Sequence, residues 1–277
     1  MGAYLQPRGL DEALRLLAQG PLTVAAGCTD LFPATERQRL AGDVLDISGV
    51  SALRGISRDD SGWRIGAATR WSDVIAADLP PGFEMLKAAA REVGSVQIQN
   101  AGTVGGNLCN ASPAADGVPP LLALDASVEL VSAAGARVLP LQAFLCGPRH
   151  TQRRPDELLS AVLVPEAAGI SAFRKLGARR YLVISIVMVA ARLVLQDGRI
   201  ERAAIAVGSC SPVARRLGAL EARLTGMTPD DLNGLEPGFL DGQLDPIADV
   251  RGTADYRLGA AEHILRRCLR DLMEGAR

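Results

Sequence analysis

Aromatic residues and net charge are both scarce in this chain of 277 residues, and each scarcity excludes a class of partner. Phe, Trp and Tyr together make up 4% of the residues, too few for the stacking platform that binds single-stranded nucleic acid. The formal net charge is −1, so no general attraction to a nucleic-acid backbone or an anionic membrane is expected. The composition is otherwise that of an ordinary globular protein, and the length suggests about two domains.

Paired cysteines and long apolar runs are also missing. No C-x-x-C pair occurs, so we predict neither a zinc site nor an iron–sulfur cluster, and no metal ligands. The scattered set indicates reduced thiols and a cytoplasmic location. The N-terminus lacks the apolar stretch of a signal peptide, and no run is long enough to span a bilayer. The longest apolar run, residues 181–191, predicts a buried strand. The five cysteines are Cys28, Cys109, Cys146, Cys210 and Cys268.

The first half of the chain predicts mixed helices and strands. Apolar spacing indicates a helix over residues 10–18 that ends at Gly20-Pro21. We then predict a small β–α–β unit with a glycine turn after its first strand. Its elements are a strand at 22–26, a helix at 31–40 and a strand at 44–47. Further elements are predicted as strands at 63–68, 127–131, 136–139 and 158–164 and as a helix at 83–93.

The second half predicts an antiparallel sheet with helices. Strands at 186–195 and 200–207 flank Asp197-Gly198, a strong hairpin signal. Two helices follow Pro212, and residues 165–170 form a plausible domain boundary. In the last helix, residues 253–273, the apolar stripe is predicted to be Tyr256, Ala260, Ile264 and Cys268. The order of elements does not alternate regularly, so we predict an α+β fold rather than a doubly wound sheet.

Two glycine turns are the candidate binding elements. The run from Asn100 to Asp116 consists almost wholly of small or turn-forming residues, and we predict an irregular loop that lets backbone approach a ligand. The segment from Ala25 to Asp30 lies between a predicted strand and helix, where amides and the helix dipole favour phosphate. Together they predict a cradle for a diphosphate, although each could be a plain structural turn. Neither matches the Rossmann or P-loop pattern.

The remaining polar residues indicate little catalytic chemistry. Asp116 could accept hydrogen bonds from a cofactor or cap a following helix. His150 in a turn and His263 on a surface have no third partner, so we predict neither a hydrolytic triad nor a histidine metal site, and no catalytic residue. The cations Arg174, Lys175, Arg179 and Arg180 could approach an anionic cofactor or form a solvated face.

Several motifs together resemble one family. Three motifs carry the resemblance: Ala26-Gly-Cys-Thr-Asp30, Thr103-Val-Gly-Gly-Asn107 and Ala111-Ser-Pro-Ala-Ala-Asp116. They resemble the FAD-binding medium subunit of molybdenum hydroxylases. This family includes xanthine dehydrogenase flavin subunits and carbon monoxide dehydrogenase medium subunits. The resemblance covers nearly the whole chain. Further landmarks follow in the family's order: Gly147-Pro to Thr151, Glu157-Leu-Leu, Phe173-Arg-Lys-Leu-Gly, and Asp249 to Arg257.

The resemblance implies a fold and a cofactor site. The fold would be a PCMH-like FAD-binding domain over residues 1–167, with α+β subdomains at about 1–54 and 55–167 that bind FAD between them. Residues 168–277 would form a C-terminal domain with an antiparallel sheet and helices. The implied cofactor contacts are Thr23, Val24, Ala25, Ala26, Gly27, Cys28, Thr29, Asp30, Thr103, Val104, Gly105, Gly106, Asn107, Ser112, Asp116, Leu159 and Lys175.

Roles within this set follow from the same resemblance. The two glycine turns would hold the FAD diphosphate through backbone groups, and Asp116 would contact the ribityl or ribose region. Leu159 and Lys175 would lie near the flavin ring. Two departures affect these expectations. Cys28 replaces the usual second glycine, which puts the conformation of the first turn in question. Val183 stands where the family often has an acidic residue, which puts a ring contact there in doubt.

The implied function is electron transfer within a complex. FAD would take electrons from a [2Fe-2S] small subunit, which drains a molybdenum cofactor in a large subunit, and would pass them to NAD or another carrier. Both metal centres are expected only in those partners, which predicts a heterotrimer. Two alternatives stay open: a self-contained flavin oxidase or dehydrogenase of a small molecule, and a non-enzymatic nucleotide-binding protein.

Overall fold

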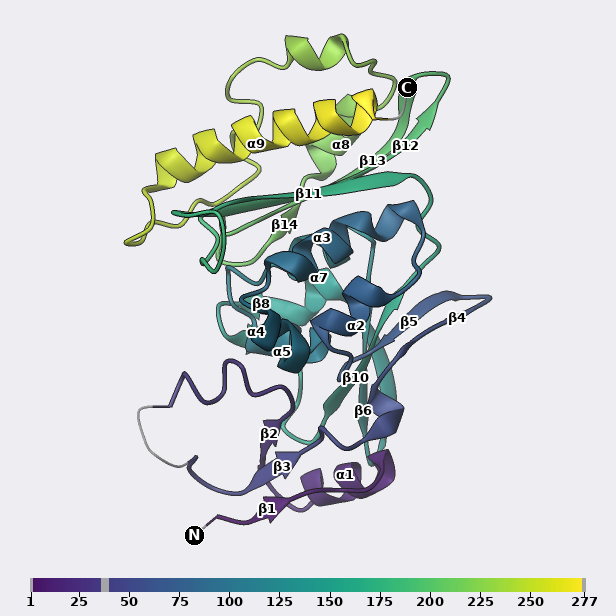
Figure 1. Ribbon diagram of the computed structural model, residues 1–277, viewed down its shortest axis with the longest axis vertical. Coiled ribbons are helices and arrows are strands. Elements are labelled where there is room, and N and C mark those ends of the chain that lie inside the picture. Colours follow the sequence, from purple (N-terminus) through teal and green to yellow (C-terminus); the bar gives the residue numbers. More distant parts are fainter. Residues whose placement is uncertain (1, 36–39, 276–277) are drawn as a thin grey trace. The chain divides into compact units, whose positions relative to one another are not determined.

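The computed structural model describes residues 2–35 and 40–275, which form two compact units (Figure 1). Each unit gathers segments that are distant in sequence. Unit 1 comprises Met1–Ala77, Ser95–Ala111 and Ala126–Pro165, and unit 2 comprises Asp78–Gly94, Ser112–Asp125 and Glu166–Arg277. The α+β class is confirmed, because helices and mainly antiparallel sheets occur in non-alternating order. The domain boundary at residue 167 stays a prediction.

Unit 1 begins with a small parallel sheet. Its strand order is β1 (Tyr4–Leu5), β3 (Val44–Asp46) and β2 (Thr23–Ala25), with both neighbours parallel to β3. Helix α1 (Leu10–Leu17) has the predicted apolar spacing and packs into the same core as Leu45. The predicted helix and both strands are therefore confirmed.

The predicted helix at residues 31–40 is wrong over its described part. Residues 31–35 form turns, with hydrogen bonds from Phe32 N to Cys28 O and from Ala34 N to Asp30 O. Phe32 is 56% exposed, so no buried apolar face supports a longer helix here. Residues 36–39 lie outside the described residues. The parallel pairing of the predicted β–α–β unit is thus correct, while its helix is not.

A five-stranded antiparallel sheet forms the larger part of unit 1. Its order is β4 (Ile56–Asp59), β5 (Gly62–Gly66), β10 (Leu158–Val164), β6 (Ser127–Ser132) and β7 (Gly135–Pro140). Strand β10 lies at its centre, as expected for a run that is buried along almost its whole length. A bulge interrupts its pairing with β6 between Leu159 and Ala161.

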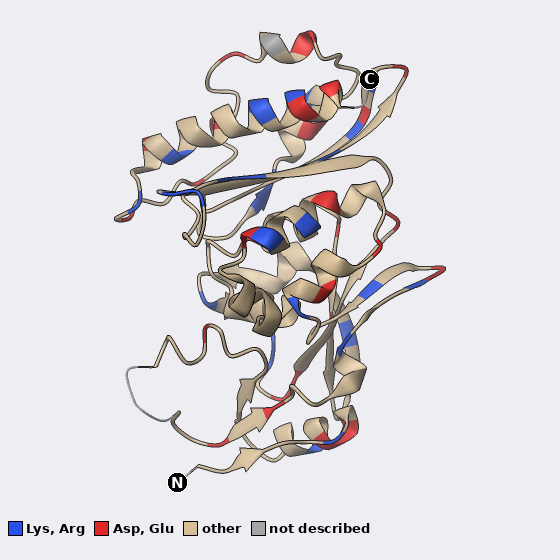
Figure 2. Ribbon diagram, in the orientation of Figure 1, with Lys and Arg blue, Asp and Glu red and all other residues tan. Residues whose placement is uncertain are grey.

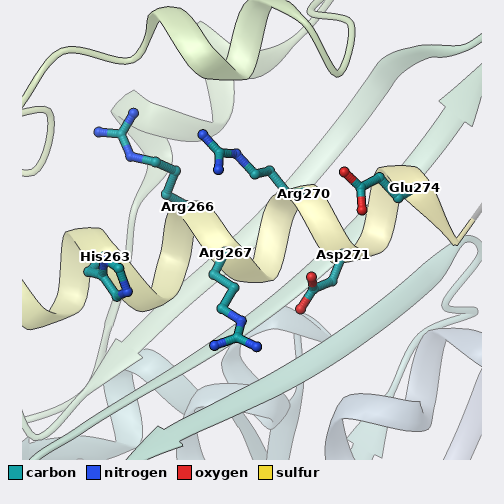
Figure 3. Close-up of a pocket in the computed structure, with 6 residues that line it drawn as sticks. All are labelled: His263, Arg266, Arg267, Arg270, Asp271 and Glu274. Atoms are coloured by element: carbon teal, nitrogen blue, oxygen red, sulfur yellow. The ribbon is translucent and has the colours of Figure 1, made fainter.

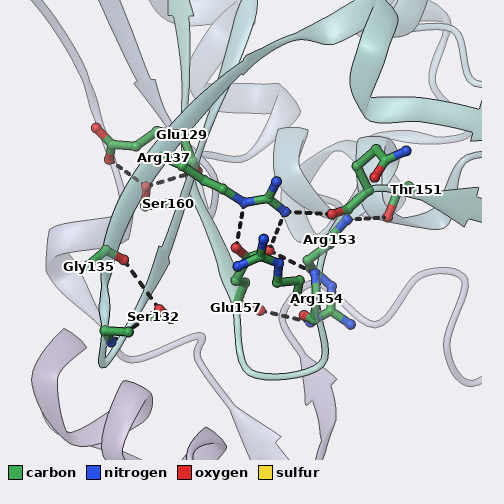
Figure 4. Close-up of polar contacts among 11 residues, drawn as sticks. Glu129, Ser132, Gly135, Arg137, Thr151, Arg153, Arg154, Glu157 and Ser160 are labelled. Carbon is green, nitrogen blue, oxygen red and sulfur yellow. Dashed lines mark hydrogen bonds and ion pairs between the residues drawn. The ribbon is translucent and has the colours of Figure 1, made fainter.

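Ion pairs join the strands of this sheet (Figure 4). Arg137 on β7 donates two hydrogen bonds to Glu157, at 2.6 and 2.9 Å. Glu129 on β6 accepts from Arg64 at 2.7 Å and from the hydroxyl of Ser160. Glu157, one of the family landmarks, therefore fixes the entry to β10.

Short helices and a small hairpin complete unit 1. The helices are α2 (Trp71–Ala76), α4 (Val96–Ala101), α5 (Val104–Asn110) and α7 (Leu141–Phe144), and the hairpin pairs β8 (Leu145–Gly147) with β9 (His150–Thr151).

The prediction of one irregular loop over residues 100–116 is wrong, because α5 occupies its middle. The Thr103 hydroxyl caps this helix by accepting from Gly106 N at 3.0 Å. Val104 and Leu108 are fully buried, which supplies the i, i+4 apolar contact. Ala111 then ends the helix in the left-handed region, with φ +45°.

Unit 2 is a four-stranded antiparallel sheet with helices on both faces. The strand order is β11 (Ile170–Leu176), β12 (Val187–Gln196), β13 (Arg199–Gly208) and β14 (Arg215–Arg216). Figure 1 shows α8 (Gly218–Leu224) and α9 (Ala254–Glu274) on one face and α3 (Glu84–Glu92) on the other. Helix α6 (Val118–Ala123) contacts β12 and β13.

The sequence predictions for unit 2 were right in type and wrong in two details. The hairpin at Asp197-Gly198 is confirmed, with φ values of +51° and +73°. The run 181–191 is not one strand, because β12 begins only at Val187. The predicted stripe of α9 is right at Cys268, which is fully buried, and wrong at Tyr256, which is 52% exposed. The residues that α9 buries are Arg257, Ala261, Leu265, Cys268, Leu269, Leu272 and Met273.

Candidate cofactor-binding site

The first glycine turn follows β2 and keeps a glycine-like backbone despite Cys28. Cys28 has φ +58°, in the left-handed region that favours glycine. A side chain costs about 1 kcal/mol in this conformation. Cysteine at this position is therefore strained in a backbone conformation that glycine would adopt freely. Burial raises the pKa of the Cys28 thiol, which makes it a poor nucleophile.

The structure brings the two predicted turns together within unit 1. A Cβ placed on Gly27 would lie 2.1 Å from the carbonyl oxygen of Ala101, at the end of α4. A Cβ on Gly102 would lie 3.3 Å from Oγ1 of Thr29. Only glycine at position 27 permits this approach of the two backbones.

Successive amides of the first turn are unpaired. Among the described residues, the N–H groups of Gly27, Cys28, Thr29 and Asp30 donate no hydrogen bond. The first three residues are half-buried and Asp30 is exposed. Adjacent N–H groups in a turn with a left-handed residue form a concavity that favours an anion.

The amides of the second turn are engaged inside the protein. Val104 N donates to Thr69 O at 3.0 Å and Gly105 N to Ala67 O at 2.8 Å. Gly106 N donates to the Thr103 hydroxyl, as described above. These bonds fix the backbone of residues 103–106 against the end of β5.

The two adjacent glycines of this turn have different surroundings. A Cβ on Gly105 would lie 2.6 Å from Cβ of Ala67, so this glycine serves packing. A Cβ on Gly106 would meet only Thr103 Oγ1, at 2.8 Å, and Gly106 is otherwise exposed. Oδ1 of the following residue, Asn107, is buried without a hydrogen-bond partner in the described structure. Open backbone beside an orphaned acceptor fits contact with a ligand.

Asp116 and Lys175 form an ion pair inside unit 2. Lys175 Nζ lies 2.7 Å from Asp116 Oδ2, and the two side chains are 6% and 9% exposed. Ser185 donates from Oγ to Asp116 Oδ1 at 2.5 Å, and Lys175 also donates to Glu92 O at 3.2 Å. Burial raises the pKa of Asp116, and the charge of Lys175 opposes that rise. Asp116 does not cap α6, whose N-cap is Gly117, so that alternative is wrong.

Sequence reasoning missed Ser185. The signal was the one serine within the apolar run 181–191, because a buried polar group requires a hydrogen-bond partner. It also missed Asp46, which ends β3 and accepts from Tyr4 Oη at 2.5 Å, Gln6 Nε2 at 3.0 Å and Ser48 N at 2.8 Å. Burial alone would raise the pKa of Asp46, but these hydrogen bonds lower it to about 2.

The other predicted contacts hold ordinary structural positions. Thr23, Val24 and Ala25 form β2, and Ala26 links it to the turn. Leu159 is buried on β10, and the Ser112 hydroxyl accepts from Ala114 N at 3.2 Å. Their cofactor roles stay predictions from the resemblance.

The predicted basic cluster does not converge on one site. Arg174 pairs with Asp271, Arg179 donates to Leu182 O, and the Arg180 guanidinium lies 5.1 Å from the Tyr181 ring centroid. In Figure 2, blue along β11 marks Lys and Arg residues on this strand. The side chain of Lys175 is only 6% exposed, whereas the three arginines are exposed, so the prediction of a solvated face holds for the arginines.

A hollow of about 400 Å³ along α9 contains none of the predicted contacts (Figure 3). Figure 3 shows Arg266 and Arg270 on one side of the helix and Arg267 on the other. Carboxylates of Asp271 and Glu274 accompany the arginines, so the charge is mixed.

Residues 2–35 and 40–275 contain neither a metal-binding cluster nor a helix that could span a membrane. This part of the chain holds no group of three or more His, Cys, Asp or Glu residues that could bind a metal ion. None of its helices is both long and apolar enough to cross a membrane.

Comparison with known proteins agrees with this geometry. Residues 1–167 match the family described as FAD binding domain in molybdopterin dehydrogenase, and residues 171–272 match the CO dehydrogenase flavoprotein C-terminal domain. The glyceraldehyde dehydrogenase medium chain of Sulfolobus acidocaldarius is 31% identical over 92% of each chain. The xanthine dehydrogenase FAD-binding subunit of Escherichia coli O157:H7 is 29% identical, over 99% of this chain and 97% of that one.

A solved structure extends the likeness to the fold. A chain of reconstituted CO dehydrogenase from Oligotropha carboxidovorans superposes with a TM-score of 0.91 at 26% identity, over 99% of this chain and 98% of that one. Fold, glycine turns and family match together define a flavoprotein subunit of an oxidoreductase. The chain belongs to the molybdopterin-dehydrogenase FAD-binding family, whose cofactor is FAD. The unpaired amides of residues 27–30 and the open side of Gly106 fit that cofactor's diphosphate.

Proposed function

We propose that this chain is the FAD-binding electron-transfer subunit of a molybdenum hydroxylase-type complex. It would receive electrons from a [2Fe-2S] subunit and deliver them to an external acceptor such as NAD. The observation that carries the proposal is the row of unpaired amides from Gly27 to Asp30, packed against the segment that leads to Gly106. A family match over residues 1–167 supports FAD as the ligand.

The chain's own part is to bind and orient the cofactor. Bound FAD supplies the one- and two-electron redox chemistry, and the protein supplies donors, shape and charge. The amides of residues 27–30 would donate to the diphosphate oxygens, and Gly106 would leave room beside them. No side chain is required as a general acid or base.

The partners we propose are an iron–sulfur small subunit and a molybdenum-cofactor large subunit. Relatives named as medium chains of glyceraldehyde and carbon monoxide dehydrogenases support this division. The five free cysteines fit a reducing compartment, and we place the complex in the cytoplasm.

The test of the cofactor site is a steric substitution at Gly106. Gly106→Leu should abolish FAD retention and leave the folded structure intact, because position 106 is exposed except for the Thr103 hydroxyl. Gly106→Ala is the matched control, since its Cβ meets the same Thr103 hydroxyl with far less bulk. Flavin absorbance and a Kd from flavin fluorescence report binding, and circular dichroism reports folding. Wild-type FAD content in Gly106→Leu would contradict the site.

A second experiment separates an electron-transfer subunit from a self-contained oxidase. The isolated chain loaded with FAD should not be reduced by aldehydes, purines or other organic substrates of the family. It should be reduced once the iron–sulfur and molybdenum subunits are added. Rapid bleaching of the flavin by an organic donor in the isolated chain would contradict the proposal.

A further inference from the structure

A buried polar cluster in unit 2 draws on residues from distant parts of the sequence. Ser185 and Lys175 each donate to a different oxygen of Asp116, at 2.5 and 2.7 Å. Ser185 is 69 residues from Asp116, and Lys175 is 59 residues from it. Two directional donors on separate oxygens fix both the position of the carboxylate and its rotation about the Cβ–Cγ bond.

The cluster leaves Asp116 able to accept further hydrogen bonds. A carboxylate has about four lone-pair sites on its two oxygens, and the two bonds described use one site on each. The adjacent ammonium of Lys175 compensates the negative charge of Asp116. An ionised carboxylate is an acceptor only, so its complementary ligand group is a donor such as a polyol hydroxyl.

We infer that Ser185 is a positioning residue of the flavin site. It holds the carboxylate of Asp116 in the orientation that accepts a hydroxyl hydrogen bond from the ribityl or ribose part of FAD, while Lys175 balances the charge. This inference rests on the proposed function. It adds a residue that no glycine motif contains and that touches the cofactor only through Asp116.

A double-mutant cycle on FAD binding tests the inference. In the full chain, Ser185→Ala should raise the Kd for FAD about tenfold, because the freed carboxylate is no longer pre-oriented. Asp116→Ala should raise it at least as much. The double variant should match Asp116→Ala within about twofold, because Ser185 acts through Asp116. A structural role for Ser185 would instead give additive effects.

Ser209→Ala is the matched control. Ser185 and Ser209 are both 1% exposed, and the Ser209 hydroxyl also contacts the segment before Asp116, through Pro113 O at 3.4 Å. It should lower the Tm with no change in the FAD Kd. Ser185→Cys fills the space of the hydroxyl with a weak donor, and it should also raise the Kd if Ser185→Ala does not fold.

The outcomes separate the two levels of the argument. If the wild type binds FAD and the Kd is unchanged in Ser185→Ala or Ser185→Cys, the inference about Ser185 is overturned and the proposed function stands. An additive double variant would overturn the inference as well. A wild-type chain that takes up no FAD under reconstitution would overturn the proposed function and this inference with it.

Discussion

Gly27 and Ala101 approach so closely that a β-carbon on Gly27 would lie 2.1 Å from the Ala101 carbonyl oxygen. No rotamer change relieves such a contact, because both groups belong to the backbone. The relation joins two segments that are 74 residues apart and places the first glycine turn beside the second. It explains why position 27 must be glycine, whereas position 28 accepts a cysteine.

The first prediction follows from this contact. Gly27→Ala should lower the free energy of unfolding by at least about 2 kcal/mol and weaken FAD binding, because backbone must move to admit the methyl group. Gly20→Ala is the control, since a Cβ there meets nothing within 4 Å. Urea denaturation and FAD titration measure the two effects. Equal stability of the two variants would contradict the packing role of Gly27.

Cys28 leads to a second prediction, of the opposite sign. Cys28→Gly should leave stability unchanged or raise it by up to about 1 kcal/mol. Relief of the strain at positive φ offsets the larger conformational entropy that glycine loses on folding. It should retain FAD. Cys28→Val should lose more than about 1 kcal/mol, since a β-branched residue is least tolerated at φ +58°. Thermal unfolding of the three proteins checks the order. A Val variant as stable as the Gly variant would contradict the argument.

Breaking the buried ion pair should be costly. Lys175→Met leaves the Asp116 carboxylate buried without its cation, and we expect a loss of about 3–5 kcal/mol. Adding Asp116→Asn removes the uncompensated charge and should recover part of that loss. Chemical denaturation at neutral pH measures both variants. If the double variant is no more stable than Lys175→Met, the unpaired charge is not the source of the cost.

Asp46 predicts a dependence of stability on acid pH. The pKa of Asp46 is about 2 in the folded protein, below the 3.8 of an unperturbed aspartate, so the folded state favours the ionised form. The stabilisation is therefore present above about pH 4 and is lost as the pH falls toward 2. The expected loss is about 1 kcal/mol, discounted because its partner Tyr4 is largely exposed. Asp46→Asn should remove this part of the pH profile, as measured by thermal unfolding between pH 2 and 6. An unchanged slope would contradict it.

The elements that could be predicted from sequence are those with local causes. Asp197-Gly198 forms its hairpin because both positions adopt positive φ without a tertiary partner. Strand β10 was predicted with the bounds that the structure shows. Helix α5 was missed because its support is the Thr103 cap and the burial of two apolar side chains, and glycine content hides both. Tyr256 was wrongly placed on the buried stripe of α9 because two neighbouring stripes had helical spacing, and only the sheet selects between them.

By itself, the sequence determined the glycine positions, the family motifs and the α+β order of the elements, since these depend on residue type and short-range spacing. The tertiary structure decided which amides stay unpaired, which of two adjacent glycines faces open space, and that Asp116 is held by Lys175 and Ser185. Those features arise from contacts between segments tens of residues apart. Such contacts depend on packing geometry, which residue type and periodicity do not encode.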